Sequence, residues 1–337
     1  MKETLKRLLP ESVIAWVRGI QASARLRQET RRQMRRFARN YAKRGSTRLA
    51  HLETRTIFFT HQIEKGLSHG NFRHGFGKGV LAEFAPLLVA FRQQDANYRT
   101  NDIYRSAMSA LHDYKVRHET DSYDLTYMRR DFPDDIWQEI ANADSRYGGV
   151  LTIKASDKAD NAAKTFVELS ESRHSLREFS DEPVNAEDIE RAVDIAMRTP
   201  SVCNRQPTRV HIITNADLIA KLMPIQHGFN GYPFPPALVL VTSDIQGFMN
   251  PDERNEGFVD GGLFSMSLLL ALEEQRLAAC PLNTCLPAGR DDATRRLLNL
   301  PDNELLVMYI AVGHFLPEAE TCMSRRFKGS DIVTVHA

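Results

Sequence analysis

The sequence predicts an α+β fold, in which helices flank a central mixed or antiparallel sheet and a helical region precedes the sheet. From residue 165 onward, stretches of helical periodicity alternate with short β-rich runs, as in a sheet covered by helices. Between 49 and 140, apolar residues recur at spacings of three and four, which favours helices alone. The polar segment 141–164 between these parts has the composition of a linker.

Composition indicates an ordinary globular protein. The chain has 337 residues, of which 42% are hydrophobic and 26% are charged. No run approaches the roughly 18 consecutive apolar residues of a membrane span. The early apolar run 13–17 is too short for the apolar part of a signal peptide. We therefore expect a cytoplasmic protein.

Charge and periodicity together predict three regions. These are a basic helical segment at 1–48, a helical N-terminal region with a glycine-rich loop and the linker at 49–160, and a ligand-binding domain at 161–337. Residues 1–50 contain 14 Lys and Arg against three acids, a net charge of +11, whereas the remainder carries −10. The two parts are expected to present different surfaces.

The basic segment predicts one or two helices, with an interruption at Pro10. Residues 25–44 contain no Pro or Gly and are rich in arginine. Three interpretations remain open for 1–44: a solvated or partner-packed helix, a helix on an anionic membrane surface with its apolar residues between 14 and 20 inward, or contact with nucleic acid. Nucleic acid is the least favoured, because no recognition motif or interleaved aromatic residues are present. A peripheral position at the inner face of a membrane is the second option for location.

A glycine-rich stretch interrupts the predicted helices of the N-terminal region. An irregular segment is expected from His61 to Ser68, and four glycines follow one another within twelve residues, Gly66, Gly70, Gly75 and Gly77. The stretch is not a phosphate-binding P-loop, because its Gly-Lys pair is followed by Gly. It is either a structural loop or a substrate-facing loop. In the second case it carries His61, Glu64, Lys65 and Arg73.

The four cysteines do not form a metal-ligand pattern. Cys203, Cys280, Cys285 and Cys322 include no C-x-x-C pair and no zinc spacing. We expect reduced, mostly buried thiols, and the sequence assigns no metal ligand.

The C-terminal domain divides into nine predicted elements. Helices are expected at 165–172, 186–198, 217–222, 260–275 and 292–299, and strands at 209–214, 237–242, 277–280 and 305–312. Asn185 stands where it can cap the second of these helices. The helix at 260–275 is apolar nearly all round and is therefore expected to be central and buried.

Two polar segments of this domain carry candidate chemistry. In the first, Arg173 and Arg177 are four residues apart and would both point at an anion, for which the planar guanidinium suits phosphate. A solvated arginine pair is the alternative. In the second, two prolines hold the backbone of 200–207, and its hydroxyl and amide groups suit hydrogen bonding to a planar heteroaromatic ligand. An ordinary helix-to-strand loop is the alternative there.

These segments, in this order, resemble the opening of the nitroreductase family. The resemblance rests on Arg-His-Ser-x-Arg-x-Phe from Arg173, and then on Asn-x-Gln-Pro before a strand. Later motifs agree with the resemblance: Asp260-Gly-Gly before an apolar helix, Cys280-Pro-Leu-Asn, Gly313-His and Ser324-Arg-Arg-Phe. The whole resemblance covers about half of the chain. The resemblance implies a homodimer that binds flavin mononucleotide (FMN) at the subunit interface, with NADH or NADPH as electron donor.

The resemblance also implies which residues bind the flavin. The phosphate and ribityl groups would be held by Arg173, His174, Ser175, Arg177 and Arg326, with Arg325 beside it. The partner subunit would contribute Pro200, Ser201, Val202, Asn204 and Gln206. The ring edge would lie beside Pro281, Leu282, Asn283 and Thr284, and its pyrimidine side near Asn230. The chemistry belongs to the cofactor, so no catalytic side chain is assigned.

The sequence departs from the short nitroreductases in two ways. Its flavin-edge segment reads Pro-Leu-Asn-Thr rather than a glycine-rich turn, and about 160 residues precede the domain. The His-x-Ile-Glu-Lys-Gly segment from His61 resembles extended members found beside enzymes of surface-polysaccharide biosynthesis, which implies a dedicated biosynthetic oxidoreductase. The alternative is a non-catalytic scaffold, with or without flavin, which the basic N-terminus attaches to a membrane or partner complex.

Overall fold

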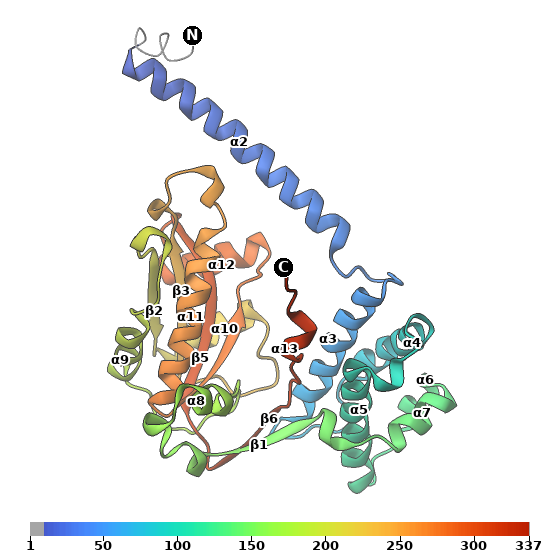
Figure 1. Cartoon of the computed structure of the whole chain (residues 1–337). Helices are drawn as coiled ribbons and strands as arrows, with labels where there is room; N and C mark the ends of the chain where they lie inside the picture. Colours follow the sequence, from blue (N-terminus) through green and yellow to red (C-terminus); the bar gives the residue numbers. More distant parts are fainter. Residues whose placement is uncertain (1–9, 337) are drawn as a thin grey trace.

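The computed structural model describes residues 10–336, and it places a helical N-terminal region beside a sheet covered by helices (Figure 1). The sheets are antiparallel and the helices flank them, so the predicted α+β fold class is confirmed. Residues 1–9 and 337 lie outside the described part, and with them the start of the predicted basic segment.

The basic segment forms one long helix, α2, from Glu11 to Asn40, and none of its residues is buried. Figure 1 shows it running past the sheet domain as a separate rod. Its polar side chains touch that domain at one place, where Arg25 forms an ion pair of 2.6 Å with Asp252 and Gln33 accepts a hydrogen bond from Arg254. Among the described helices, none is both long and apolar enough to cross a bilayer.

The N-terminal region is a small helical bundle, as predicted. Its α-helices are α3 (Leu49–Leu67), α4 (Lys78–Gln94), α5 (Asp102–Thr120), α6 (Thr126–Asp131) and α7 (Asp134–Ala141), with the short 3-10 helix η1 (Tyr98–Thr100). Phe84, Phe91 and Tyr114 are fully buried at its centre. The bundle therefore has a hydrophobic core of its own.

The prediction of an irregular segment from His61 to Ser68 is wrong, because α3 continues through these residues to Leu67. Gly66 lies in the last turn of α3, where a Cβ atom would come within 1.8 Å of the Phe76 ring. The glycine is thus required by a close approach rather than by a loop. The loop itself follows α3, and Gly77, at φ +68°, precedes α4.

The predicted linker at 141–164 contains a strand. β1 (Val150–Lys154) pairs antiparallel with β6 (Glu318–Cys322), and the 3-10 helices η2 (Ser145–Tyr147), η3 (Ala155–Lys158) and η4 (Asn161–Ala163) complete the segment. The sequence signal was weak because the partner of this five-residue strand lies at the far end of the chain. The three predicted region boundaries stay predictions.

The main sheet has the strand order β2 (Thr208–Ile213), β3 (Ala237–Asp244), β5 (Glu304–His314) and β4 (Leu277–Asn283). Alternate residues of β3 face opposite sides. Val239 and Val241 pack with α9 (Ala186–Ala196) and α11 (Glu256–Glu274), whereas Leu238 and Leu240 pack with α10 (Ala216–Gln226) and α12 (Ala288–Leu298). The sheet is thus buried on both faces.

The short elements of this domain include two helices, α8 (Phe166–Ser172) and α13 (Gly329–Ile332). Three 3-10 helices, η5 (Val202–Asn204), η6 (Ile245–Gly247) and η7 (Pro251–Glu253), lie between the larger elements.

Two local predictions need correction. Asn185 precedes α9, but its side chain makes no capping hydrogen bond. The side-chain cap is found at α8, where Thr165 and Glu168 form a reciprocal capping box. The predicted burial of the helix at 260–275 holds for only part of its surface. α11 covers the sheet with one face, and the opposite face exposes the large apolar side chains Phe258, Val259, Leu263 and Met266.

Candidate functional site

The arginine-bearing segment after α8 is held between two strands. Leu176 donates its backbone N–H to the carbonyl of Ala279 in β4, at 3.2 Å. On the other side, the Thr321 hydroxyl of β6 donates to the carbonyl of Ser175, at 2.9 Å. His174 turns its Nδ1 to the Ser172 carbonyl, at 2.8 Å. The backbone around Ser175 is therefore rigidly placed.

Arg173 and Arg177 both carry buried guanidinium nitrogens that have no hydrogen-bond partner among residues 10–336, Nη1 of Arg173 and Nε of Arg177. Burial lowers the pKa of Arg173, and the nearby charge of Arg326 adds to the lowering. Arg177 donates through Nη1 to Cys322 Sγ, at 3.8 Å. Each of these N–H groups is a strong donor whose hydrogen-bonding capacity is not met within the described residues.

Lys65, in the last turn of α3, brings a third cation from the N-terminal region. Its Nζ donates to the carbonyl of Gly228 at 3.1 Å, and burial followed by the charge of Arg177 lowers its pKa. Burial raises the pKa of the Cys280 thiol, and Arg177, Lys65 and Arg173 all oppose that rise. All three cations are thus close enough to this buried strand position to act on the Cys280 thiol. We call Lys65, Arg173 and Arg177 the basic cluster.

No member of the basic cluster forms an ion pair with a carboxylate in residues 10–336. Such a concentration of partly buried positive charge is costly unless an anion compensates it. The two C-terminal arginines differ from each other. Arg326 approaches Arg173, whereas Arg325 pairs with Asp102 at 3.4 Å and lies over the Tyr147 ring.

The segment 228–232 closes one side of the cluster against α3. The Tyr232 hydroxyl donates to the Lys65 carbonyl at 2.7 Å, and the ring of His69 stacks on the Tyr232 ring with the centroids 3.6 Å apart. Burial lowers the pKa of His69 to about 4, so this imidazole is neutral at pH 7. Asn230, the predicted pyrimidine contact, is exposed and donates to the His227 carbonyl.

The predicted flavin-edge segment lies at the end of β4. Pro281, Leu282 and Asn283 belong to the strand and pair with β5. Thr284 follows it, and its hydroxyl donates to the carbonyls of Leu306 and Val307 at 3.2 and 2.9 Å. This side chain is used within the fold, so any contact from Thr284 to a ligand would come from its backbone.

The predicted interface loop, 200–206, is held in a strained conformation. Cys203, Asn204 and Gln206 all have positive φ, between 48° and 56°. The Ser201 hydroxyl accepts a hydrogen bond from the Gln206 backbone at 3.0 Å, and the Asn204 side chain accepts one from the Gln206 amide at 3.1 Å. Pro200 precedes this loop. The side chains of Asn204 and Gln206, which the sequence suggested as ligand contacts, form hydrogen bonds within the loop and stabilise its conformation.

Within one chain, the structure does not bring this loop to the basic cluster. Val202 donates its N–H to Asp260 near the start of α11, at 3.2 Å. Ser172, which precedes Arg173, donates to Glu273 near the end of the same helix, at 3.3 Å. Thirteen residues of α-helix separate the two attachment points by roughly 20 Å. The two halves of the predicted flavin site are therefore distant within a subunit.

The four residues of the possible substrate-facing loop, His61, Glu64, Lys65 and Arg73, do not all lie in a loop. The first three are helical, and only Arg73 lies in the loop, where it is exposed. The neighbouring Cys322 and Glu64 side chains raise the pKa of His61 to about 9. Lys65 was absent from the predicted flavin-binding residues because its proximity to Arg177 is created by tertiary packing.

The fold and site define an α+β domain with a buried cationic site beside a sheet strand, whose members form no ion pair with a carboxylate in residues 10–336. Residues 171–233 and 235–314 match the model of the nitroreductase family, so the predicted resemblance is confirmed for this part of the chain. The match covers less than half of the chain, and the helical N-terminal region lies outside it.

Individual relatives agree with the family match. A predicted NAD(P)H nitroreductase of Streptococcus pyogenes, Spy0809, is 36% identical over 61 residues, which are 18% of this chain and 30% of that protein. A predicted NAD(P)H nitroreductase of Bacillus subtilis, MhqN, is 25% identical over 201 residues, covering 49% of this chain and 93% of that protein. The crystal structure of a nitroreductase family protein from Clostridium difficile 630 is 26% identical, covers 52% of this chain and 99% of its own, and gives a TM-score of 0.43. The matched part of this chain spans less than a third of the length of the Streptococcus pyogenes protein.

Proposed function

We propose that this chain is an FMN-dependent oxidoreductase that uses NADH or NADPH as electron donor. The observation that carries the proposal is the basic cluster, in which Arg173 and Arg177 keep buried guanidinium nitrogens without a partner in the described part of the chain. A phosphate group supplies the negative charge and the acceptor oxygens that these nitrogens lack. The names of the relatives support the class of reaction.

The residues present fit a phosphorylated flavin. Arg173 and Arg326 would hold the phosphate, and Arg177 and Lys65 would supply further positive charge to the same ligand. His174 and Ser175 would contact the ribityl group. The segment 281–284 would lie beside the ring edge.

Bound FMN would supply the hydride chemistry between a donor and a second substrate. The protein orients the cofactor by hydrogen bonds and charge. Packing of Tyr232 and His69 against α3 keeps water from one side of the basic cluster, which strengthens electrostatic interactions there. No side chain is assigned as an acid or base.

The proposal includes a homodimer. Two observations support it: the roughly 20 Å along α11 between the loop 200–206 and the basic cluster, and the exposed apolar face of α11. A second copy that packed on this face would exclude water from Phe258, Val259, Leu263 and Met266. It would also bring its own Pro200, Ser201, Val202, Asn204 and Gln206 toward the cluster of the first copy.

Flavin retention tests the proposal. Purified full-length protein should be yellow, and NADH or NADPH should bleach it. Arg173→Ala and Arg326→Ala should each cost roughly 1.5–3 kcal/mol, the value of a hydrogen bond to a charged group, which is about a 10- to 100-fold weaker Kd for FMN. Arg296→Ala, which removes an exposed arginine of α12, is the matched control and should leave the Kd unchanged.

Colourless protein that gains no colour with added FMN would refute the proposal. Protein that binds FMN but is bleached by neither nicotinamide donor would favour the predicted alternative, a flavin-binding scaffold. The setting in surface-polysaccharide biosynthesis and the cytoplasmic or membrane-peripheral location stay predictions from the sequence.

A further inference from the structure

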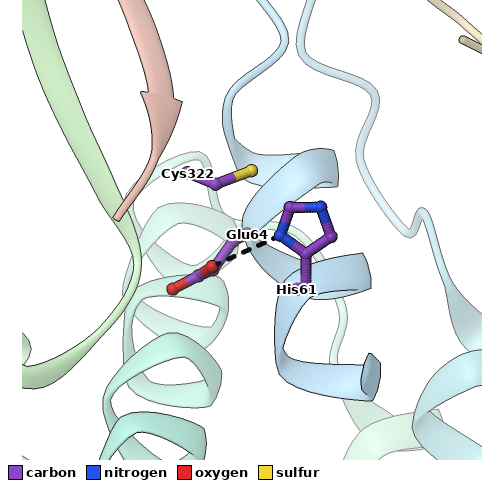
Figure 2. A group of neighbouring side chains, drawn as sticks. All are labelled: His61, Glu64 and Cys322. Atoms are coloured by element: carbon purple, nitrogen blue, oxygen red, sulfur yellow. Dashed lines mark ion pairs between the residues drawn. The ribbon is translucent and has the colours of Figure 1, made fainter. Parts of the chain in front are cut away.

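Three side chains with metal-binding atoms, from two distant parts of the chain, lie close together next to Arg177 of the basic cluster. His61 and Glu64 lie one turn apart on α3, and Cys322 ends β6. One ligand atom from each lies within 4.8 Å of the others, and Figure 2 shows the three side chains directed toward one another. Glu64 and Cys322 are buried, whereas about a third of the His61 side chain is exposed.

The distance between His61 and Glu64 suits a shared ion better than a direct hydrogen bond, and Ser324 Oγ lies 3.4 Å from the same His61 nitrogen. His61 Nδ1 lies 3.8 Å from Glu64 Oε2, which is too long for a hydrogen bond. Two ligands on one tetrahedral zinc ion, with bonds of about 2.0–2.3 Å, lie about 3.5 Å apart. The imidazole and the carboxylate therefore need to move little to share an ion.

We propose that His61, Glu64 and Cys322 form a three-ligand site for a divalent transition metal of the zinc class, with a fourth position open to solvent or to a substrate. Imidazole, carboxylate and thiolate are all ligands that zinc accepts. The carboxylate and the thiolate together supply two negative charges, which match a dication.

The surrounding groups already orient two of the ligands. Glu64 accepts backbone hydrogen bonds from Gly149 at 3.3 Å and from Ser324 at 3.2 Å, one to each carboxylate oxygen. Arg177 donates to Cys322 Sγ, at 3.8 Å. Donors of this kind hold metal ligands in place and stabilise their negative charge. The carboxylate keeps lone pairs free for an ion, because each oxygen accepts only one of these bonds.

Two of the three proposed ligands, His61 and Glu64, line a pocket. A cavity of about 330 Å³ is lined by His61 and Glu64 from α3, by Asp102 from α5, and by Ser324 and Phe327 from the C-terminal segment. Three protein ligands and one open position next to a cavity are the arrangement of a catalytic rather than a structural zinc site. The proposal does not depend on flavin binding.

The test is zinc content of the full-length protein. Wild-type protein is equilibrated with zinc chloride and freed of excess by gel filtration, and bound zinc is then measured by mass spectrometry. We expect one zinc per chain. His61→Ala and Cys322→Ser should each weaken zinc binding by more than about 100-fold, the upper end for loss of an outer-shell partner.

Matched controls separate the site from general effects. His51→Ala removes another histidine of α3, which hydrogen-bonds to Ser46, and Cys285→Ser removes an exposed thiol; both should keep one zinc. Since a variant of a buried residue can fail to fold, X-ray absorption of wild-type protein reads the ligands directly. It should show one sulfur at about 2.3 Å and lighter ligands at about 2.0–2.2 Å.

Wild-type protein that binds no zinc would overturn the proposal. Zinc that Cys322→Ser retains, or an absorption spectrum without sulfur, would overturn it equally, because the ion would then have other ligands.

Discussion

The buried ion pair between Lys158 and Glu273 supports the segment that carries Arg173. Lys158 Nζ lies 2.7 Å from Glu273 Oε1, and both side chains are at most 4% exposed. Lys158 also donates to the carbonyl of Ser172, and the Ser172 hydroxyl donates to Glu273. The pair therefore joins η3, the end of α11 and the residue before Arg173 in one network.

Lys158→Met should destabilise the fold strongly. The substitution leaves Glu273 charged and buried without its counterion, for which the expected loss is about 3–5 kcal/mol of the free energy of unfolding. Lys158→Met/Glu273→Gln should lose less than the single variant, because the uncompensated charge is removed while an acceptor for Ser172 remains. The network predicts that Lys158→Met also weakens FMN retention, since the backbone before Arg173 loses its support.

The matched control is an exposed pair in the same part of the molecule. Lys154 and Glu318 face each other across β1 and β6 at 3.9 Å, and both are more than half exposed. Lys154→Met should cost no more than about 1 kcal/mol. Urea unfolding followed by far-ultraviolet circular dichroism measures all three variants. A loss of stability for Lys158→Met no larger than that for Lys154→Met, or a double variant less stable than the single, would contradict this role of the buried ion pair.

Two further predictions concern the helical region. Burial, reinforced by the charge of Glu64, raises the pKa of Asp113 to about 6, so the folded state binds this proton more tightly than the unfolded chain. Stability should therefore fall as pH rises from about 4 through 6, and Asp113→Asn should raise the thermal midpoint more at pH 8 than at pH 5; an equal gain at both would contradict this. Gly66→Ala should lower the free energy of unfolding by about 1–3 kcal/mol, because the new methyl group displaces Phe76. Gly79→Ala has open space around the new methyl group and should raise the free energy of unfolding by about 0.5–1 kcal/mol. Equal urea midpoints for the two variants would refute the steric argument.

The sequence predicted the elements of the C-terminal domain well, because their signals are local. The strand at 237–242 was recognised from a continuous apolar run, which a strand buried on both faces requires, and β3 has this character. The helix at 186–198 was recognised from its apolar stripe, and α9 ends two residues earlier. The capping hydrogen bond expected from Asn185 was not formed, since a cap depends on side-chain rotamers that the sequence pattern does not determine.

The candidate sites were less predictable because they are formed by contacts between distant segments. Arg173 and Arg177 could be recognised from their spacing, but Lys65 is more than a hundred residues earlier and meets them only through the packing of α3. Cys322 had no local pattern at all, and it meets His61 and Glu64 because β6 ends beside α3. The loop predicted at Gly66 was wrong for a related reason. Glycine is needed there because the ring of Phe76, ten residues later, packs against it, and not because the local backbone leaves the helix.

The helical N-terminal region is part of the site rather than an addition to it. Lys65 supplies one of the three cations of the basic cluster, and Tyr232 is bound to the end of α3 through Ser68 and the Lys65 carbonyl. β1 pairs with β6, the strand that ends at Cys322. A chain cut at 160 would therefore lose a cation, a strand partner and the cover of Tyr232 together. The basic cluster therefore includes a residue outside the part of the chain that matches the nitroreductase family, so the proposed flavin site draws on the helical region as well.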